Sequence, residues 1–329
     1  MPTPMMMSYI LTACAIPLVL HYHLLPAVFA GLAVHVLTIK LARKLPSHLS
    51  RNAQVVALAL IMASVISVVF GVIFAIWSLL HGQNGMADLL LAVAETLEKI
   101  KRTLPSDLAA TMPESINELR DQLGLILHEN SHRISAAGMA GIKTFAHILF
   151  GMIIGGMTAV HHFGDTGAWP PLTSELHSRA KALTGAFDKV VFAQIKISAL
   201  NTALTAVYLL VLLPLFGVHI PLVSALVLLT FVAGIIPVIG NLVSNFAIVL
   251  ISLGMSPGIG AASLVFLIVI HKLEYFTNAR IVGGEVHARA WELLCAMLFM
   301  EAIFGMAGMI AAPVVYGWIK AELSANEMI

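Results

Sequence analysis

The chain has 329 residues, of which 59% are hydrophobic and 11% are charged, and its mean hydropathy is +0.95. Soluble domains carry about 25% charged residues, so this composition excludes an ordinary water-soluble domain and indicates a protein that spans a lipid bilayer several times. The net charge of +1 argues against a nucleic-acid partner, because phosphate contacts need clustered Lys and Arg. The two cysteines, Cys14 and Cys295, are too few for a disulfide framework, and we expect no cofactor.

Residues 1–84 are predicted to form the N-terminal transmembrane helices. The charge-free run 1–39 is too long for one crossing and contains HYHLLP at 21–26, which predicts a tight hairpin of two helices. The loop 40–51 that follows has four basic residues and no acidic ones, so the positive-inside rule places it in the cytoplasm. A second charge-free run, 52–87, predicts a further crossing.

Residues 85–142 are predicted to form an amphipathic helical segment outside the membrane. Between residues 88 and 133 there are eight acidic and five basic residues, which places this segment on the side opposite to the loop 40–51. Apolar residues recur here every three or four positions and are interrupted at Pro105 and Pro113, a pattern typical of amphipathic helices. We expect these helices to pack on the membrane region or on neighbouring subunits.

Residues 143–320 are predicted to form the C-terminal transport region, followed by a tail, 321–329. Crossings are expected near 143–162, 197–217 and 219–237, with a loop over 163–196. Two further apolar segments, 241–271 and 293–319, break at glycines and are predicted as hairpins that flank a polar loop, 272–292. If both hairpins turn back, that loop and the chain's C-terminal end are cytoplasmic; if they cross fully, the sides change.

The fold class predicted from these segments is an all-α, polytopic transmembrane protein. It has seven or eight membrane segments, some of them broken or re-entrant.

The strongest candidate for a substrate pathway is the motif GIIPVIGNLVSN at 234–245. Pro237 removes a helix hydrogen bond and Gly240 permits strained backbone, which frees carbonyl groups at membrane depth. Beside them, Asn241, Ser244 and Asn245 recur at helical spacing and could bind a polyhydroxylated solute or a cation. The alternative is a proline-kinked helix whose polar groups satisfy one another.

Three more polar residues are candidates for a role in transport. Asn278 is a further candidate for the pathway. Glu274 either pairs with Lys272 or Arg280 in an interfacial loop or gates the site. Glu301 stands alone in an apolar segment, so it is predicted either to lie near the lipid headgroups or to couple protons to transport.

Enzymatic motifs and metal sites are not expected. His161, His162 and Asp165 resemble metal ligands, but adjacent histidines point to different faces, so we predict no metal site. The chain has no Walker-type phosphate loop, which argues against direct drive by ATP, and no evident nucleophile with a base. The sequence therefore predicts a protein that is not an enzyme.

Three motifs together resemble the C-terminal half of the autoinducer-2 exporter family of bacterial membrane permeases. They are GIIPVIGNLVSN at 234–245, HKLEYFTNARIVGG at 271–284 and GMAGMIAAPVVYG at 305–317, in this order and spacing. Gln194 stands where the family usually has a Gly-Gln pair, although Ala193 replaces the glycine here. The resemblance implies a multi-pass permease of the bacterial inner membrane that exports a small polar solute by secondary or facilitated transport. It also implies a homo-oligomer, expected to be a pentamer-like ring.

Two alternatives to this function remain open. Some members of the family are linked to cation-proton exchange, which implies an antiporter that uses Glu301 or Glu274. Gln194, Glu274 and Glu301 are the candidates for coupling or gating. The other alternative is a membrane scaffold that transports nothing, in which the polar kinks only fix helix packing.

Overall fold

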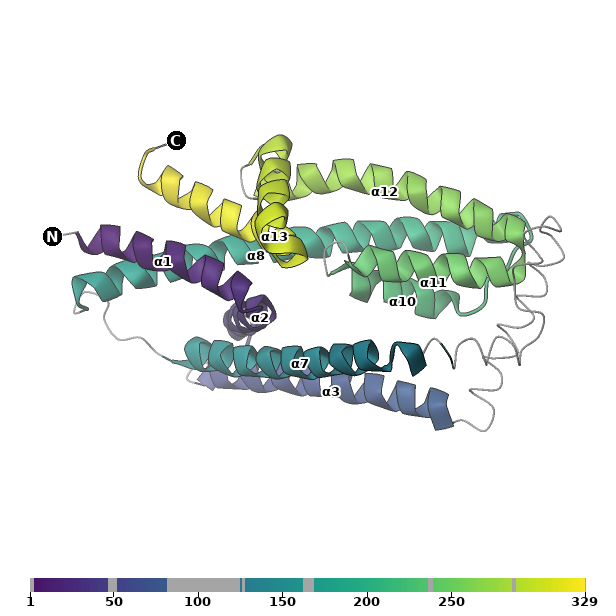
Figure 1. Ribbon diagram of the computed structural model, residues 1–329, viewed down its shortest axis with the longest axis horizontal. Helices are drawn as coiled ribbons and strands as arrows, with labels where there is room; N and C mark the ends of the chain where they lie inside the picture. Colours follow the sequence, from purple (N-terminus) through teal and green to yellow (C-terminus); the bar gives the residue numbers. More distant parts are fainter. Residues whose placement is uncertain are drawn as a thin grey trace. The chain divides into compact units, whose positions relative to one another are not determined.

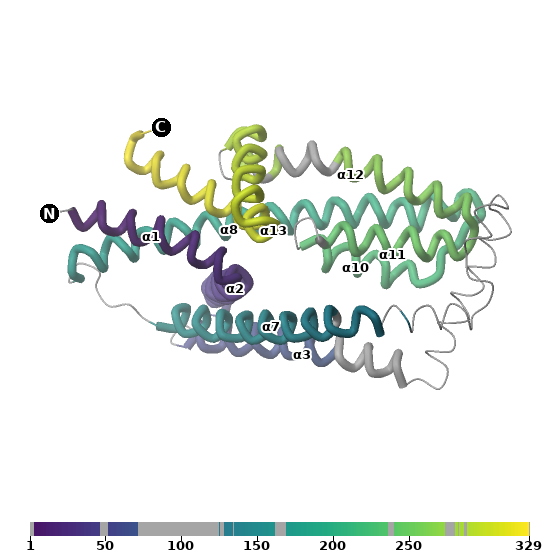
Figure 2. The backbone as a smooth tube through the Cα atoms, viewed as in Figure 1, coloured from purple at the N-terminus to yellow at the C-terminus, as the bar shows by residue number. Residues whose placement is uncertain are grey.

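The computed structural model describes residues 3–46, 52–81, 125, 128–161, 169–235, 239–285 and 288–328, with the side chains of 72–81, 134, 239, 274–279 and 282 left out. Within these ranges the chain forms helices and turns and has no strand (Figure 1). Figure 2 traces the same path as a tube, with the remaining residues in grey. Most of the predicted amphipathic segment, 85–142, lies outside the described residues.

Six helical segments are long and apolar enough to cross a membrane: α1 (Pro4–His21), α2 (Leu25–Ala42), α3 (Ala53–His81), α7 (Ser131–Val160), α8 (Pro171–Val207) with its continuation to Leu215, and α13 (Ala290–Ala325). The continuation consists of a π-helix, η3 (Tyr208–Leu212), and α9 (Leu213–Leu215). Three further apolar helices are α10 (Val223–Gly234), α11 (Ile239–Met255) and α12 (Pro257–Glu285). The predicted all-α, polytopic membrane fold is confirmed.

The chain folds into two compact units. Unit 1 contains residues 1–69, 138–193 and 282–329, and unit 2 contains residues 70–137 and 194–281. Unit 1 therefore holds α1, α2, most of α3 and α7, the first half of α8, and α13. Unit 2 holds the second half of α8 together with α10, α11 and most of α12.

In unit 1, α2 and α7 cross closely because glycines remove the side chains between them. A Cβ atom added to Gly151 would lie 2.0 Å from the carbonyl oxygen of Ala27, and one added to Gly155 would lie 2.0 Å from that of Gly31. A hydrogen bond of 3.1 Å between His35 Nδ1 and Thr158 Oγ1 follows one turn later. Small residues four positions apart are the usual way for membrane helices to approach. Figure 1 shows α2 nearly end-on where it passes α7, so the two helices cross steeply at these glycines.

Helix α13 is a hairpin, because its backbone breaks at Gly305. This glycine has φ 63° and ψ −150°, a conformation that residues with a side chain rarely adopt. The two arms, 290–304 and 306–325, pack so closely that a Cβ on Gly308 would lie 2.1 Å from the carbonyl oxygen of Met300. Glu292 of the first arm accepts hydrogen bonds from Tyr316 (2.8 Å) and Lys320 (2.6 Å) of the second. The break predicted at residues 305–308 is confirmed, and both arms end on the same side.

Ion pairs of unit 1 join helices at the charged half of α8. Arg179 pairs with Glu175 one turn before it and with Glu322 of α13, and both Arg179 and Glu322 are buried. Lys40, at the end of α2, pairs with Asp188. The loop predicted over 163–196 is therefore wrong for residues 171–196, which are helical. Their charges are accommodated because they pair with neighbouring helices or lie exposed on the helix.

In unit 2, the helices α10, α11 and α12 pack along the second half of α8. A core formed by Tyr208, Leu209, Leu213, Ile220, Leu226, Ile248 and Leu267 fills the space between them. Helix α10 has 12 residues and is about 18 Å long, shorter than the ~30 Å hydrocarbon core and shorter than the crossing predicted near 219–237.

The turn between α11 and α12 follows the predicted break. Ser256 separates the two helices, accepts a hydrogen bond from the backbone N–H of Ile259 (3.2 Å), and is followed by Pro257 at the first helical position. Helix α12 then continues to Glu285, so the loop predicted over 272–292 is wrong for residues 272–285. No proline or glycine interrupts the chain between residues 261 and 282, and the helix ends only after Gly283 and Gly284.

Candidate functional site

A row of polar side chains on the second half of α8 and the first residue of η3 forms the candidate site. Gln194, Ser198, Asn201, Thr205 and Tyr208 are spaced alternately four and three residues apart, which places them on one face of the helix. Ser198, Asn201, Thr205 and Tyr208 are buried, and Gln194 is half-buried. We call this row, with the groups that it contacts, the polar seam. It lies entirely within unit 2 and, from residue 197 onward, in a charge-free part of the chain.

At one end of the polar seam, α8 satisfies the carbonyl groups at the end of α10. Gln194 Nε2 donates to the carbonyl oxygen of Gly234 (2.8 Å), and Ser198 Oγ donates to that of Phe231 (2.6 Å). The last four carbonyls of a helix have no partner within it, and hydrocarbon supplies none. These two side chains therefore make it possible for α10 to end inside the protein.

Glycines allow the backbone to approach closely at the same place. A Cβ on Gly234 would lie 2.7 Å from Ser198 Oγ, and one on Gly240 would lie 1.7 Å from the carbonyl oxygen of Ala233. Helix α11 therefore begins in direct backbone contact with the end of α10. A larger residue at Gly240 requires one of these helices to move, whereas one at Gly234 displaces the Ser198 hydroxyl.

In the middle of the polar seam, two asparagines meet. Asn201 Nδ2 donates to Asn241 Oδ1 over 3.1 Å, which joins α8 to the first turn of α11. One turn later, the buried Ser244 donates to the carbonyl oxygen of Gly240 (3.2 Å) within its own helix. Thr202 Oγ1, next to Asn201, is buried and has no hydrogen-bond partner among the described residues.

At the other end of the polar seam, three hydroxyl groups form a chain. The hydroxyl of Tyr208 lies 2.9 Å from Ser263 Oγ of α12, and Ser263 donates to Ser252 Oγ of α11 over 2.8 Å. The Tyr208 ring stacks on Phe266, with centroids 3.9 Å apart. Tyr208 also begins the π-helix η3, which precedes Pro214 and takes up the disturbance that a proline without an N–H causes. Irregular turns of this kind are frequent at functional sites.

The structure brings some of the predicted site residues together and separates others. Gln194, Gly240, Asn241 and Ser244 belong to the polar seam, whereas Asn245 lies half-buried beyond Ser244. Pro237 is outside the described residues, and of Glu274 and Asn278 only the helical backbone in α12 is described. Glu301 lies in unit 1 on α13.

The sequence interpretation missed several polar residues that the structure adds: Ser198, Asn201, Thr205, Tyr208, Ser252 and Ser263. For Ser198, Asn201 and Thr205, the alternating spacing of three and four residues along α8 could have predicted a shared helix face. Among the described residues, no three His, Cys, Asp or Glu side chains gather as metal ligands, and His162 and Asp165 lie outside those residues.

Glu301 is a second candidate site. It lies nine residues beyond Glu292 in the first arm of α13, about 14 Å along the arm from the end at which Glu292 and Lys320 pair. It is exposed and makes no hydrogen bond or ion pair with any residue that the structure describes. Glu301 is therefore an unpaired acidic side chain within an apolar arm. Ionisable residues in apolar membrane segments usually serve a function.

Comparison with known proteins identifies the family of this chain. Residues 5–327 match the family described as "AI-2E family transporter". The Bacillus subtilis (strain 168) protein named "Putative transport protein YdbI" is 29% identical over 126 residues, which cover 38% of this chain and 34% of that protein. The chain thus matches about a third of that relative's length. No solved structure matches the chain. Because the family match covers nearly all of the sequence, the chain belongs to the AI-2E transporter family, and its membrane-length apolar helices are those of a multi-pass membrane protein.

Proposed function

We propose that this transporter exports a small polar solute across the bacterial inner membrane along the polar seam of unit 2. Transport is secondary or facilitated, and the protein works as a homo-oligomer. The observation that carries the proposal is the end of α10, where Gln194 and Ser198 hold backbone carbonyls beside the paired Asn201 and Asn241. Amides, hydroxyls and carbonyls in a charge-free region offer the hydrogen bonds that an uncharged, hydroxyl-rich solute needs.

The hydrogen bonds of the polar seam are suited to exchange with a solute. Interhelical hydrogen bonds in membranes contribute about 0.6–2 kcal/mol each. A single bond of this strength does not fix the position of one helix against another. A solute that enters between α8 and the α10–α11 hairpin replaces the Asn201–Asn241 bond and the bonds to Phe231 and Gly234 with its own. The glycines Gly234 and Gly240 keep the backbone of the hairpin within reach of that solute.

The test is to replace Asn241 with leucine. Asn241→Leu removes the hydrogen-bonding amide but keeps a side chain of similar size, so we expect normal insertion and loss of export. Untargeted mass spectrometry of the medium, from cells with equal amounts of wild-type and variant protein, identifies the solute. Its flux is then measured in proteoliposomes. The matched control is Ser224→Leu, which replaces an exposed polar residue on α10 outside the polar seam.

Two outcomes of this test contradict the proposal. If folded protein and export decline together in Asn241→Leu, the polar seam serves packing. If the wild-type protein changes no exported metabolite and carries no flux, the scaffold alternative holds.

A second candidate function, cation-proton exchange, is favoured by Glu301, which is exposed in an apolar arm and has no partner among the described residues. A carboxylate is the kind of group that exchanges a proton for a cation, which makes Glu301 the candidate for coupling. Glu301→Gln keeps the shape but cannot release a proton, so it is expected to abolish the dependence of flux on a pH gradient. The control is Glu327→Gln, which changes an exposed acid past the end of α13. Unchanged pH dependence in Glu301→Gln removes Glu301 from the mechanism.

A further inference from the structure

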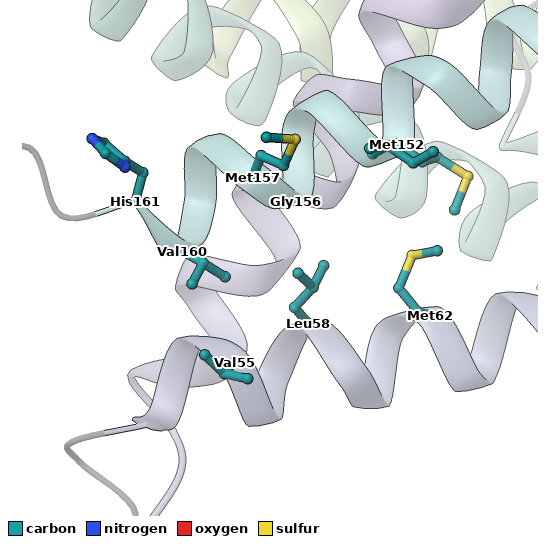
Figure 3. A pocket seen from close by; sticks show the side chains of 9 residues that line it. Val55, Leu58, Met62, Met152, Gly156, Met157, Val160 and His161 are labelled. Atoms are coloured by element: carbon teal, nitrogen blue, oxygen red, sulfur yellow. The ribbon is translucent and has the colours of Figure 1, made fainter.

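A groove of about 620 Å³ lies between α3 and α7 in unit 1 (Figure 3). Its walls include Val55, Leu58 and Met62 of α3 and Met152 and Met157 of α7. Apart from His161 at one end, all of the lining residues are apolar. Such a wall offers nothing to a polar solute, so the groove is distinct in chemistry from the polar seam.

The groove is shallow and opens sideways from a packed helix pair. At its floor Met152 is 6% exposed, and a Cβ on Gly156 would lie 2.9 Å from a methyl group of Leu58, so α3 and α7 touch there. At its mouth, Val55 and Met157 are 52% and 67% exposed. The depth of the groove is that of side chains, which suits a flexible hydrocarbon chain better than the backbone of another helix.

The groove starts at the membrane end of both helices. Val55 is the third residue of α3, and Val160 is the last residue of α7. Met152 lies eight residues before Val160, so the groove reaches about 12 Å inward from the helix ends. Both helices have the length and composition of membrane spans, so the medium at this mouth is the outer part of the hydrocarbon core.

Positive charge gathers at the same end. Residues 43–52 join the end of α2 to the start of α3, so this linker ends beside Val55 at the same end of the groove. Arg43 and Lys44, directly after α2, are exposed. The whole stretch 40–51 has four basic residues and no acidic one, the pattern of a cytoplasmic surface, where anionic lipid headgroups collect.

We propose that this groove binds an anionic phospholipid, with an acyl chain between α3 and α7 and the headgroup beside Arg43 and Lys44. The apolar wall takes the hydrocarbon, and the flexible thioethers of Met62, Met152 and Met157 adapt to its shape. The exposed Arg43 and Lys44 attract an anionic headgroup electrostatically, which gives the preference for an anionic lipid.

The experiment uses the full-length protein in phosphatidylcholine vesicles that contain a small fraction of phosphatidylglycerol with a photoreactive diazirine on its acyl chain. After irradiation, the labelled residues are mapped by peptide mass spectrometry. We expect adducts on the floor residues Met62 and Met152, reduced at least five-fold by excess unlabelled phosphatidylglycerol but not by added phosphatidylcholine. Ile154, which is 61% exposed and outside the groove, reports the bulk lipid in the same sample.

Variants test the groove and the charges separately. Met157→Trp fills the mouth and is expected to lower floor labelling at least five-fold, whereas the matched control Ile154→Trp leaves it unchanged. The double variant Arg43→Gln/Lys44→Gln is expected to remove the preference for phosphatidylglycerol. Absence of label on Met152, equal labelling in Met157→Trp, or equal competition by both lipids in the wild type overturns the proposal. So do disulfide-linked dimers of Val55→Cys, which assign the groove to a second copy.

Discussion

The buried pair of Arg179 and Glu322 gives a prediction whose size follows from its surroundings. The two residues are 7% and 6% exposed and join α8 to the second arm of α13. Glu322 Oε2 also accepts a hydrogen bond from Tyr9 (3.2 Å), whereas Glu322 Oε1 has no partner among the described residues. In Arg179→Met the carboxylate therefore keeps only the tyrosine hydroxyl. We expect a loss of about 3–5 kcal/mol in the free energy of unfolding, typical of a buried ion pair with one partner removed.

Replacing both partners should restore most of that loss. Arg179→Met/Glu322→Leu leaves no buried charge, so its stability is expected to lie near that of the wild type or up to about 4 kcal/mol above it. Equilibrium unfolding in mixed detergent micelles, followed by circular dichroism, measures all three proteins. The control is Lys181→Met, an exposed cation on the same helix that should change stability by less than about 0.5 kcal/mol. If Arg179→Met is no more destabilising than this control, the pair does not hold α13 to α8.

Three further predictions concern packing, strain and sidedness. Gly155→Ala should lower the free energy of unfolding by about 1–3 kcal/mol, because its Cβ would lie 2.0 Å from the Gly31 carbonyl oxygen, whereas Gly138→Ala, in open space on the same helix, should not. Gly305→Ala should cost about 1–3 kcal/mol in the same measurement, because alanine resists its backbone conformation; a stability equal to the wild type would contradict the strained hairpin tip. Cysteines at Lys44 and Ser324 should both react with an impermeant maleimide from the cytoplasmic side only, and labelling from opposite sides would refute the topology of α13.

Charge-free runs and helix breakers were enough to predict much of the fold. The hairpin turn at 21–26, the break before Pro257 and the break at Gly305 all follow from local rules about proline, glycine and apolar length. The two predicted loops failed because charge density was taken as a sign of a loop. Arg179 and Asp188 remain on a helix because their partners come from α13 and α2, which the local sequence does not reveal.

The candidate site could be predicted only in part. Gln194 and Asn241 stood out as polar groups in apolar surroundings, and both lie in the polar seam. Their partners could not be assigned, because the pairs Gln194–Gly234 and Asn201–Asn241 are 40 residues apart in the chain. They meet only because α10 is short and ends beside α8, and helix length near a glycine-rich turn is poorly determined by sequence.

The hairpin at Gly305 has a consequence for how the chain is inserted during synthesis. By length and hydropathy, residues 290–325 count as one membrane crossing. One crossing would place the residues after 325 on the side of the membrane opposite to residue 290. Because Glu292 and Lys320 meet, the two ends of the segment lie together, as in a hairpin that enters and leaves a bilayer from one side. No polar stretch has to be translocated, and only the bend around Gly305 travels inward. The hairpin can therefore insert after the translocon has released the earlier helices, as a late step that depends on folding.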